Sequence, residues 1–547
     1  MQVEQQMKKY GLPVSLALLL VNLGFLVWYL FVGYQAAFHS DSAAKVLLAR
    51  EIVETGKYFP PHWNYVNGDL FVLFGHTFII PLLAFMPAGY TAHAISGLIS
   101  SALILSGVWF LTGLAPLSRV RRVLIVAVMA AGISGFAAEN LYGQVSYGVF
   151  VYFACYMVFF SWQCIRAEQT GKWPWAAALL IAVVLVFWMN PQRALILFGL
   201  PLLAATVILR LELRDIISRA QSKGIWLQLL MVFTGIAIGG YLHMRTLSGV
   251  NNVMGAGYAR WLSYDSMLRN ISLTPMGLLA IFGGAPSVDG AVISRTGLYE
   301  AVRLIAALVL LGLMPVAAVR SLRQREPGLF FLGVFSLVAL LGVLFLQMTT
   351  TVPDMRDPVT SSRYLVPSLI FLLILVLMQP IDWIRSPVFG FSVIAVLMVF
   401  LTSAYPTFVR TDRCYKYSWG RARDNTYPHK GLVDFLVSNN LRYGYGTYWN
   451  AGNISVLSNE KVLVRGIVIN KGVPMPFRWL SSDRWYAPSS WRGDTFLLLT
   501  QEEAKEIDWN RLSLKQVRPV RELKFDAYTI YIFSGNIAEH LPGWGRK

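Results

Sequence analysis

Residues 11–34 read GLPVSLALLLVNLGFLVWYLFVGY, and this stretch decides the class of the chain. It has no charged residue and is longer than the roughly 20 mostly apolar residues that a helix needs to cross a bilayer. It follows Lys8 and Lys9, is too long for the core of a signal peptide, and is not followed by a small-residue cleavage site. The sequence therefore predicts a retained membrane anchor.

The rest of the chain has a similar composition. Of its 547 residues, 56% are hydrophobic and 14% are charged, whereas soluble proteins have about 25% charged residues. This composition excludes a cytosolic enzyme, a disordered scaffold and a small secreted module. The formal charge of +18 is typical of contact with lipid headgroups or phosphate-bearing ligands. Nucleic acid is disfavoured because the basic residues are spread over loop ends. Three cysteines, Cys155, Cys164 and Cys414, are too few for a disulfide framework.

Hydropathy predicts a polytopic α-helical membrane protein with about eleven transmembrane helices. After 11–34 they are expected at 92–114, 123–138, 148–165, 174–189, 194–211, 225–243, 301–320, 329–347, 365–381 and 388–405. With a cytoplasmic N-terminus, Lys and Arg gather in the inside loops, as in Arg119–Arg122. This requires that the apolar stretch 71–87 is a re-entrant or interfacial helix, and the stretch 272–285 is ambiguous in the same way. The odd number of crossings then leaves the C-terminus outside.

The character of the chain changes at about residue 406. Residues 406–547 hold 21 Lys and Arg and 13 Asp and Glu, with no run long enough to span. Helix-like 430–440 is followed by strand-like 445–449, 461–469 and 494–500, by helix-like 501–507 and by a hairpin through VRELKF and AYTIYIF. We therefore expect a transmembrane catalytic domain, 1–405, with a first outside loop, 35–91, and an extracytoplasmic α/β domain, 406–547.

The first outside loop contains the most informative sequence. Ser40, Asp41 or Ser42 is suited to cap a helix that runs to Thr55 and stops at Gly56. Apolar residues repeat at helical spacing, so the helix is expected to lie amphipathically on the outer membrane surface. Asp41 and Lys45, four residues apart, share another face of this helix. The pattern places a carboxylate and an ammonium where the chain leaves the bilayer.

Two segments resemble a known family. The first comprises Asp41, Lys45, the run Ala49-Arg50-Glu51-Ile52-Val53-Glu54-Thr55-Gly56, Tyr58 and Pro61-His62-Trp63-Asn64. The second is Ser362-Arg363-Tyr364-Leu365-Val366-Pro367. Together they resemble the polyprenyl-phosphate-dependent GT-C glycosyltransferases, and most closely the branch of the aminoarabinose–lipid A transferase and the protein O-mannosyltransferases. The number of spans and the outside C-terminal domain agree with that plan.

The resemblance implies an inverting transfer of sugar from a lipid phosphate, such as undecaprenyl phosphate, at the extracytoplasmic face. Such a reaction needs a base for the acceptor hydroxyl and positive charge on the departing phosphate. Asp41 is the expected base, although an N-cap is the ordinary role of an aspartate at this place. The branch often has Asp-Glu where this chain has Asp41-Ser42. It also often has Lys-Pro-Pro where this chain reads Leu73-Phe74-Gly75-His76, so His76 is a candidate substitute for that lysine.

Several further residues are candidates for the site. Glu139 is the only acid in its outside loop and suits orienting the acceptor, binding a metal or pairing with an arginine. The candidates for binding substrate are Lys45, His62, His76, Arg193, Arg356, Arg363 and Tyr364. The basic residues among them are equally typical of snorkelling anchors or ion pairs, for example Arg356 with Asp354 or Asp357, and Tyr364 suits an interfacial aromatic belt. No spacing amounts to a metal signature, but some relatives bind a divalent ion, so a metal stays open.

Two other functions fit a chain of this kind. A transporter or flippase of lipid-linked saccharides is usually built from two repeated halves with polar groups near the membrane midplane, and no such repeat is visible. A ligase also has many spans but typically uses a lipid diphosphate. The sequence favours a glycosyltransferase of the bacterial inner membrane with a polyprenyl-phosphate sugar as donor and a glycan, lipid or protein as acceptor. An archaeal or endomembrane origin stays open.

Overall fold

The computed structural model describes residues 2–166, 171–254, 259–286, 291–353, 357, 359–380, 386–409, 429–541 and 543–545. It forms two compact units, and neither is continuous in the sequence. Unit 1 consists of Met1–Gly33, Leu98–His243 and Ala256–Asn425, and unit 2 of Tyr34–Gly97, Met244–Gly255 and Thr426–Lys547. The first loop thus belongs to the same unit as the C-terminal region. The predicted division of the chain at residues 405 and 406 stays a prediction.

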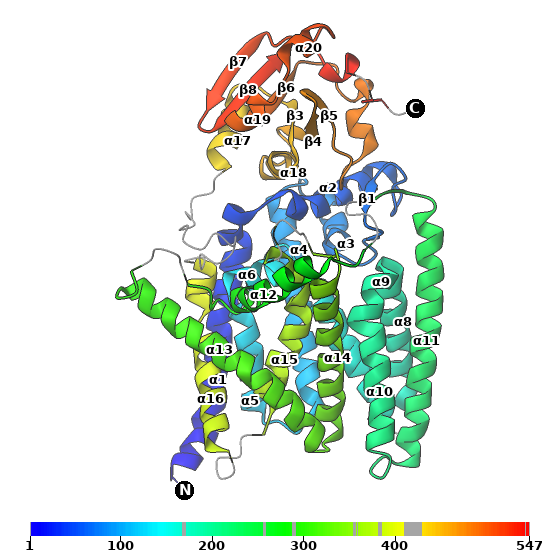
Figure 1. The fold of residues 1–547 in the computed structure, drawn as a ribbon, viewed down its shortest axis with the longest axis vertical. Helices are drawn as coiled ribbons and strands as arrows, with labels where there is room; N and C mark the ends of the chain where they lie inside the picture. The colour runs from blue at the N-terminus through cyan, green and yellow to red at the C-terminus, as the bar shows by residue number, and fades with distance from the viewer. Residues whose placement is uncertain are drawn as a thin grey trace. The chain divides into compact units, whose positions relative to one another are not determined.

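Unit 1 is made of helices, most of them long and roughly aligned, with α13 running obliquely (Figure 1). They are α1 (Gln2–Phe31), the end of α4 (Tyr90–Leu111), α5 (Arg119–Ala130), α6 (Gly135–Ala138), α7 (Gly148–Arg166), α8 (Lys172–Met189), α9 (Pro191–Ala194), α10 (Leu200–Glu212), α11 (Arg219–Leu247), α12 (Tyr264–Ile281), α13 (Arg295–Arg323), α14 (Pro327–Thr349), α15 (Val366–Met378) and α16 (Pro387–Leu401).

Nine helices of the described residues are long and apolar enough to cross a membrane. They correspond to nine of the eleven predicted spans, and the chain is a polytopic membrane protein as expected. The other two predicted spans are 388–405 and 123–138. The first corresponds to α16, which has 15 residues and is short for a crossing. The second is a broken helix rather than the straight one predicted, since α5 and the segment Gly135–Gly143 meet at 88°.

A left-handed turn causes this break. Gly132 has φ +80°, and a Cβ placed on it would lie 2.5 Å from the ring of Phe408. Ile133 follows with φ 66°, so the backbone leaves the helical region for two residues. Ser134 then starts α6, because its Oγ accepts a hydrogen bond from the backbone N–H of Ala137 at 3.0 Å. Glu139 follows directly, as the first residue of a π-helical turn.

Small and polar residues allow the helices of unit 1 to pack closely. Gly235 and Gly239, four apart on α11, face α8 closely. A Cβ added to Gly235 would lie 2.6 Å from Val183 Cγ1, and one added to Gly239 would lie 2.6 Å from the carbonyl oxygen of Val184. This is the small-xxx-small pattern of membrane helix pairs. Asn22 on α1 donates from Nδ2 to the carbonyls of Ala127 on α5, at 2.9 Å, and Leu401 on α16, at 3.0 Å.

The apolar stretch 71–87 is too short to cross as a helix. Its helical part is α3 (Gly75–Ile79) and a 3₁₀ turn (Ile80–Ala84). These are ten residues, about half of what a crossing needs. The other ambiguous stretch, 272–285, falls mostly on α12, which contains Pro275 and is not among the helices long and apolar enough to cross. Both stretches thus agree with non-crossing segments, the first by its length and the second because α12 is not among the helices both long and apolar enough to cross.

Unit 2 contains a six-stranded mixed sheet with helices beside it (Figure 1). The strands are β3 (Tyr443–Thr447), β4 (Leu463–Asn470), β5 (Val473–Pro476), β6 (Thr495–Thr500), β7 (Arg521–Phe525) and β8 (Tyr528–Phe533), in the order β5-β4-β3-β6-β8-β7. The accompanying helices are α17 (Lys430–Ser438), α18 (Gly452–Leu457), α19 (Gln501–Lys505) and α20 (Trp509–Ser513). A two-stranded parallel sheet joins β1 (Asn64–Val66) and β2 (Asn251–Val253). The predicted α/β domain and its terminal hairpin, β7 with β8, are confirmed.

Both faces of the six-stranded sheet are buried. On β6, Leu497 and Leu499 belong to one apolar cluster, and Phe496 and Leu498 belong to another. Successive side chains of a strand point to opposite faces, so a central strand covered on both sides reads as a continuous apolar run. This is why 494–500 has no alternating pattern in the sequence.

The predicted amphipathic helix is α2 (Ser40–Thr55). Its stop at Gly56 is confirmed, because Gly56 has φ 65° and its N–H donates to the Ile52 carbonyl at 2.8 Å. The expected single apolar face is wrong, because eleven of its sixteen residues are buried. One face packs on α18, where a Cβ added to Gly452 would lie 3.1 Å from Leu47 Cδ1. The helix is therefore a core element of unit 2.

Glu51 ties α2 to the C-terminal part of the same unit. It is 1% exposed, and its Oε1 accepts from Ser482 Oγ at 2.8 Å and from Arg484 Nη1 at 3.2 Å. Glu51→Ala leaves the buried Ser482 hydroxyl without this acceptor, which typically costs about 1–3 kcal/mol. We expect the apparent melting temperature to fall by roughly 2–8 °C.

The control for this prediction is Glu502→Ala. Glu502 is 83% exposed and pairs with Lys505 within α19, so its removal is expected to leave the melting temperature unchanged. Differential scanning fluorimetry of the two purified variants measures both values. Equal melting temperatures for Glu51→Ala and the wild type would show that this buried contact does not stabilise unit 2.

Candidate functional site

The first turn of α2 is held by side-chain contacts rather than by a cap of its own. The N-cap position is His39, and its side chain makes no capping hydrogen bond. Ser40 Oγ donates to the carbonyl of Tyr448, and Ser42 Oγ lies 2.6 Å from the hydroxyl of Tyr34. The hydroxyl of Tyr448 donates to Asp41 Oδ1. The N-cap interpretation of Asp41 is therefore wrong, since its carboxylate is turned to Tyr448.

Tyr448 fixes the direction of this carboxylate. Desolvation raises the pKa of Tyr448 well above its ordinary value, and the negative charge of Asp41 raises it further. The phenol therefore stays protonated and remains the donor. One carboxylate oxygen of Asp41 is occupied by this bond, which orients the second oxygen. A carboxylate held in this way is suited to accept a proton at a fixed place.

Lys45 lies one turn further along α2 and is buried. It is 5% exposed, and its Nζ lies 5.5 Å from the centre of the Phe74 ring. Burial lowers the pKa of Lys45 to about 7, while the neighbouring charge of Asp41 acts to raise it. The predicted proximity of Asp41 and Lys45 is thus present as an electrostatic interaction. A lysine near its midpoint at neutral pH gains a proton when an anion binds beside it.

Lys45 also contacts the segment in which the related branch often has a lysine of its own. A Cβ added to Gly75 would lie 2.8 Å from Lys45 Cδ, so the lysine stem occupies the space beside this glycine. His76, the next residue, is fully buried, and neither ring nitrogen has a hydrogen-bond partner within the described residues. Burial lowers the pKa of His76 to about 3. Its imidazole is therefore neutral and suits contact with a ligand as an N–H donor rather than as a cation.

The segment around His62 is attached to the C-terminal part of unit 2. The side chain of His62 is exposed, whereas Trp63 is fully buried and packs edge-on against Trp485. Asn64 Nδ2 donates to Asp483 Oδ1 and to the carbonyl of Ser481, both at 3.0 Å. The matched residues of this segment thus have a structural role, and no contact places His62 beside Asp41.

The remaining candidates that the structure describes belong to unit 1. Glu139 is buried at the start of its π-helical turn, and Arg193 lies half-buried on α9. Arg363 and Tyr364 lie on a 3₁₀ turn, Thr360–Leu365, just before α15. Tyr364 packs edge-on against Tyr147, which follows the Glu139 turn, so these two loops of unit 1 are neighbours. Arg356 lies outside the described residues.

Tyr448 could not be identified from the sequence, because it lies 407 positions from Asp41 in a strand-rich region. Nor did the sequence indicate a metal site by spacing, and within the described residues no group of three or more His, Cys, Asp and Glu gathers as metal ligands would. The site that the structure brings together consists of Asp41, Tyr448, Lys45 and the segment Phe74–His76. We call these residues the α2 site.

Comparison with known proteins identifies the fold. No family model matches the chain, and no curated protein matches it. Among solved structures, ArnT from Cupriavidus metallidurans bound to undecaprenyl phosphate matches with a TM-score of 0.51 and 11% identity, over 98% of each chain. ArnT in the apo state matches with a TM-score of 0.52 and 10% identity, over 94% of this chain and 97% of that one.

A looser match is the archaeal oligosaccharyltransferase AglB from Archaeoglobus fulgidus in complex with an inhibitory peptide and a dolichol-phosphate. Its TM-score is 0.43 at 12% identity, over 91% of this chain and 70% of that one, which is too low to support an argument. The ArnT matches extend over nearly the whole chain, membrane helices and C-terminal region alike. The chain therefore has the GT-C fold, the fold of the membrane glycosyltransferase ArnT.

Proposed function

We propose that this chain is an inverting glycosyltransferase, which moves a sugar from a polyprenyl-phosphate donor to a glycolipid, polysaccharide or protein of the cell envelope. The observation that carries the proposal is the α2 site, in which a carboxylate held by Tyr448 lies next to a buried lysine. The likeness to ArnT, which was solved with undecaprenyl phosphate bound, supports the class of donor.

In the proposed reaction the acceptor hydroxyl oxygen attacks the anomeric carbon of the sugar. The bond between this carbon and the phosphate oxygen breaks, and polyprenyl phosphate leaves with the bonding electrons. Asp41 takes the proton of the acceptor hydroxyl, and the Lys45 ammonium stabilises the phosphate charge that develops. Because attack comes from the side opposite the leaving group, the anomeric centre inverts.

The other candidates have supporting roles in this proposal. Arg363 is suited to bind the phosphate with paired N–H donors, and Arg193 and Arg356 to strengthen the same positive field. Tyr364 and the neutral His76 offer hydrogen bonds to phosphate or sugar oxygens. Glu139, buried in unit 1, is proposed to orient the acceptor hydroxyl. We assign no role in binding to His62, because its exposed side chain belongs to a structural segment.

We propose that the chain is a bacterial inner-membrane protein, and the bias of Lys and Arg toward alternate loops supports a cytoplasmic N-terminus. The α2 site and the C-terminal sheet then lie on the periplasmic face. Labelling of single cysteines, introduced into a variant in which Cys155, Cys164 and Cys414 are replaced, tests this orientation. A cysteine at position 120 is expected to be inaccessible from outside, and outside labelling there would contradict the topology.

The proposed activity is tested with the purified full chain and a panel of undecaprenyl-phosphate sugars. The acceptors are supplied as glycolipid, polysaccharide and protein fractions of a bacterial envelope. We expect release of undecaprenyl phosphate together with transfer of the sugar from at least one donor, with an inverted anomeric configuration by NMR. Retention of configuration would refute the single-base mechanism. Movement of an intact lipid-linked sugar across a vesicle membrane without transfer would instead identify a flippase.

Gly75→Ala tests whether Lys45 binds the donor phosphate. The added Cβ would lie 2.8 Å from Lys45 Cδ and 3.1 Å from Ser96 Oγ, so the lysine must shift. Overpacking of this kind costs about 1–3 kcal/mol, and we expect the affinity for undecaprenyl phosphate to fall by roughly tenfold. Gly24→Ala is the matched control, because an added Cβ there meets nothing within 4 Å. The affinities are measured by titration with undecaprenyl phosphate in detergent. Equal affinities of the two variants would show that Lys45 does not bind the donor phosphate.

A further inference from the structure

Unit 2 contains a polar groove beside the later turns of α2. A cavity of about 630 Å³ lies between the later turns of α2 and the loops around β3 and β4, and a second of about 490 Å³ adjoins it. Both are lined by Glu460, Leu463 and Trp491, so they form one continuous groove. Each volume is within the range of about 300–1,000 Å³ typical of ligand pockets. Asp41 and Lys45 line neither cavity.

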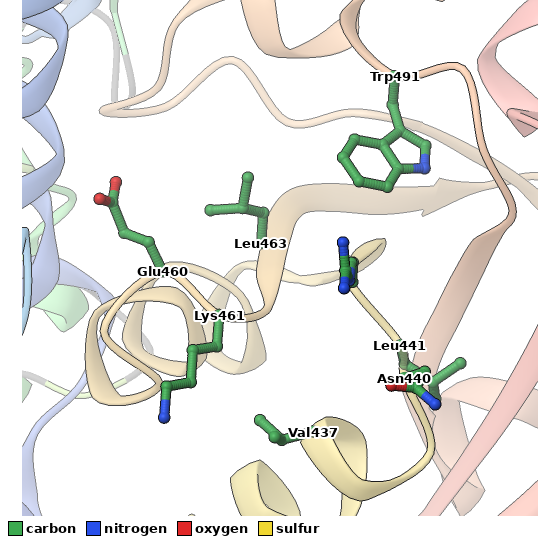
Figure 2. A pocket seen from close by; sticks show the side chains of 8 residues that line it. Val437, Asn440, Leu441, Glu460, Lys461, Leu463 and Trp491 are labelled. Carbon is green, nitrogen blue, oxygen red and sulfur yellow. The ribbon is translucent and has the colours of Figure 1, made fainter.

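Aromatic rings, two of them half-buried tryptophans, form one wall of the groove. Trp491 stacks on Tyr443 with their ring centres 5.2 Å apart and their planes 10° apart, and its Nε1 donates to the carbonyl of Asp494 at 3.0 Å. These contacts hold the indole in a fixed orientation. Figure 2 shows Trp491 and Glu460 on either side of Leu463. A rigid indole beside carboxylates and hydroxyls is suited to a ligand with both C–H faces and hydroxyl groups, as a pyranose ring has.

Each of the three carboxylates of the groove lies near an arginine of the groove. Glu51 and Glu54 lie 3.2 Å and 3.7 Å from Arg484, and Glu460 lies 3.6 Å from Arg50. Three further basic residues line the groove without a salt bridge to any described residue, although Arg465 interacts electrostatically with Glu460: Arg442, Lys461 and Arg465. The groove therefore has an excess of positive charge that its own carboxylates do not neutralise, which favours an anionic ligand.

Arg465 is the residue most directly prepared for such a ligand. It is 9% exposed, and its guanidinium lies 4.2 Å from the centre of the Trp485 ring and 5.5 Å from that of Tyr443. Its Nε has no hydrogen-bond partner among the described residues. Arg465 lines the cavity, and its contacts with the two rings hold a cation at the cavity wall, which favours an anionic ligand there.

We propose that this groove binds the acceptor as an anionic oligosaccharide, one that carries a phosphate or a carboxylate on its sugars. The inference rests on the proposed function and specifies its substrate class. Trp491 and Trp485 stack against the sugar rings, Arg465 with Arg442 and Lys461 binds the anionic group, and Glu460 accepts from sugar hydroxyls. Transfer takes place at Asp41, so the groove holds the part of the acceptor that does not react.

The geometry of α2 sets the length of this acceptor. Leu47 and Glu54, which bound the groove on α2, follow Asp41 by six and thirteen residues. At about 1.5 Å per residue the groove extends along the helix from roughly 9 Å to roughly 20 Å beyond Asp41. An acceptor therefore needs more than one sugar to reach both the base and the groove, and a trisaccharide is a suitable probe.

Binding to the full chain in detergent tests the groove independently of catalysis. The probes are trigalacturonic acid, a maltotriose bearing a 1-phosphate, and unmodified maltotriose, observed by saturation-transfer NMR and titration. We expect at least one anionic trisaccharide to bind about tenfold more tightly than maltotriose, and Arg465→Met or Trp491→Ala to weaken it by about tenfold or more. The arm that binds more tightly identifies phosphate or carboxylate as the preferred anion.

The controls separate this proposal from the catalytic one. Arg465→Lys retains the positive charge and Trp491→Phe retains an aromatic ring, so these conservative variants distinguish loss of a contact from misfolding. Arg511 is an exposed arginine of α20, and Arg511→Met is expected to bind the probes as the wild type does. Asp41→Asn is expected to retain groove binding. Binding of the anionic probes without sugar transfer from any donor would refute the proposed function but would still support oligosaccharide binding by the groove. Anionic probes that bind no more tightly than maltotriose, or transfer that is unchanged in Arg465→Met and Trp491→Ala, would overturn the groove.

Discussion

Asp41→Asn is expected to reduce sugar transfer by about 10²–10⁴-fold, the usual contribution of a positioned general base. Asparagine has nearly the same shape and still offers an oxygen to the Tyr448 hydroxyl, so the fold of α2 should be preserved. The amide cannot take the proton of the acceptor. The loss should therefore appear in kcat, while the dissociation constant for undecaprenyl phosphate changes by less than about threefold.

Tyr448→Phe is the partner experiment for this prediction. It removes the hydrogen bond that orients Asp41 and retains the carboxylate, so we expect a smaller loss in kcat, of about tenfold. The melting temperatures of both variants should stay close to that of the wild type. A fully active Asp41→Asn variant would place the base elsewhere. Equal losses in the two variants would indicate that Asp41 holds structure rather than accepts a proton.

The second large effect is a dependence of donor binding on pH. Because burial lowers the pKa of Lys45 to about 7, the free protein loses this ammonium as the pH rises through neutrality. The phosphate of the donor favours the protonated lysine, so its affinity is highest below pH 7. Above this value we expect affinity to fall by up to tenfold per pH unit, until the pKa of the bound state is reached.

Two variants isolate the contribution of Lys45. Lys45→Arg retains the positive charge, and a guanidinium does not titrate in this range, so the affinity should be nearly constant between about pH 7 and 9. Lys45→Met should weaken binding by about 10–150-fold below pH 7, the usual range for a hydrogen bond to a charged group. Isothermal titration with undecaprenyl phosphate measures both. An unchanged pH dependence in Lys45→Arg would assign the titration to another group.

Much of the fold follows from local sequence patterns. Apolar runs located the helices of unit 1 because the length of a crossing depends on composition alone. The break between α5 and α6 could not be predicted, because Gly132 is compatible with a straight helix until the ring of Phe408 packs against it. The same holds for the burial of α2. Its stop at Gly56 is a local signal, but its contact with Gly452 depends on a chain segment some 400 residues away.

The site likewise contains residues that local sequence could predict and residues that only the tertiary structure identifies. Asp41 and Lys45 could be found from their spacing on one helix and from the resemblance of their surroundings to a family. Tyr448 could not, since a tyrosine in a strand-rich region has no distinguishing pattern until the fold brings it to Asp41. The groove depends on residues from α2, β3, β4 and the loop before β6, and only their packing reveals it. Sequence therefore predicted the residues of one helix, and tertiary structure supplied their partners.

The most direct test of the account is a cryo-electron microscopy map of the full chain with bound undecaprenyl phosphate. We expect a phosphate oxygen within about 3 Å of Lys45 Nζ, an ordinary charge-assisted hydrogen bond, and the Asp41 carboxylate facing the bound lipid phosphate. A phosphate bound away from Lys45, with Asp41 turned from every space that a sugar could occupy, would contradict it.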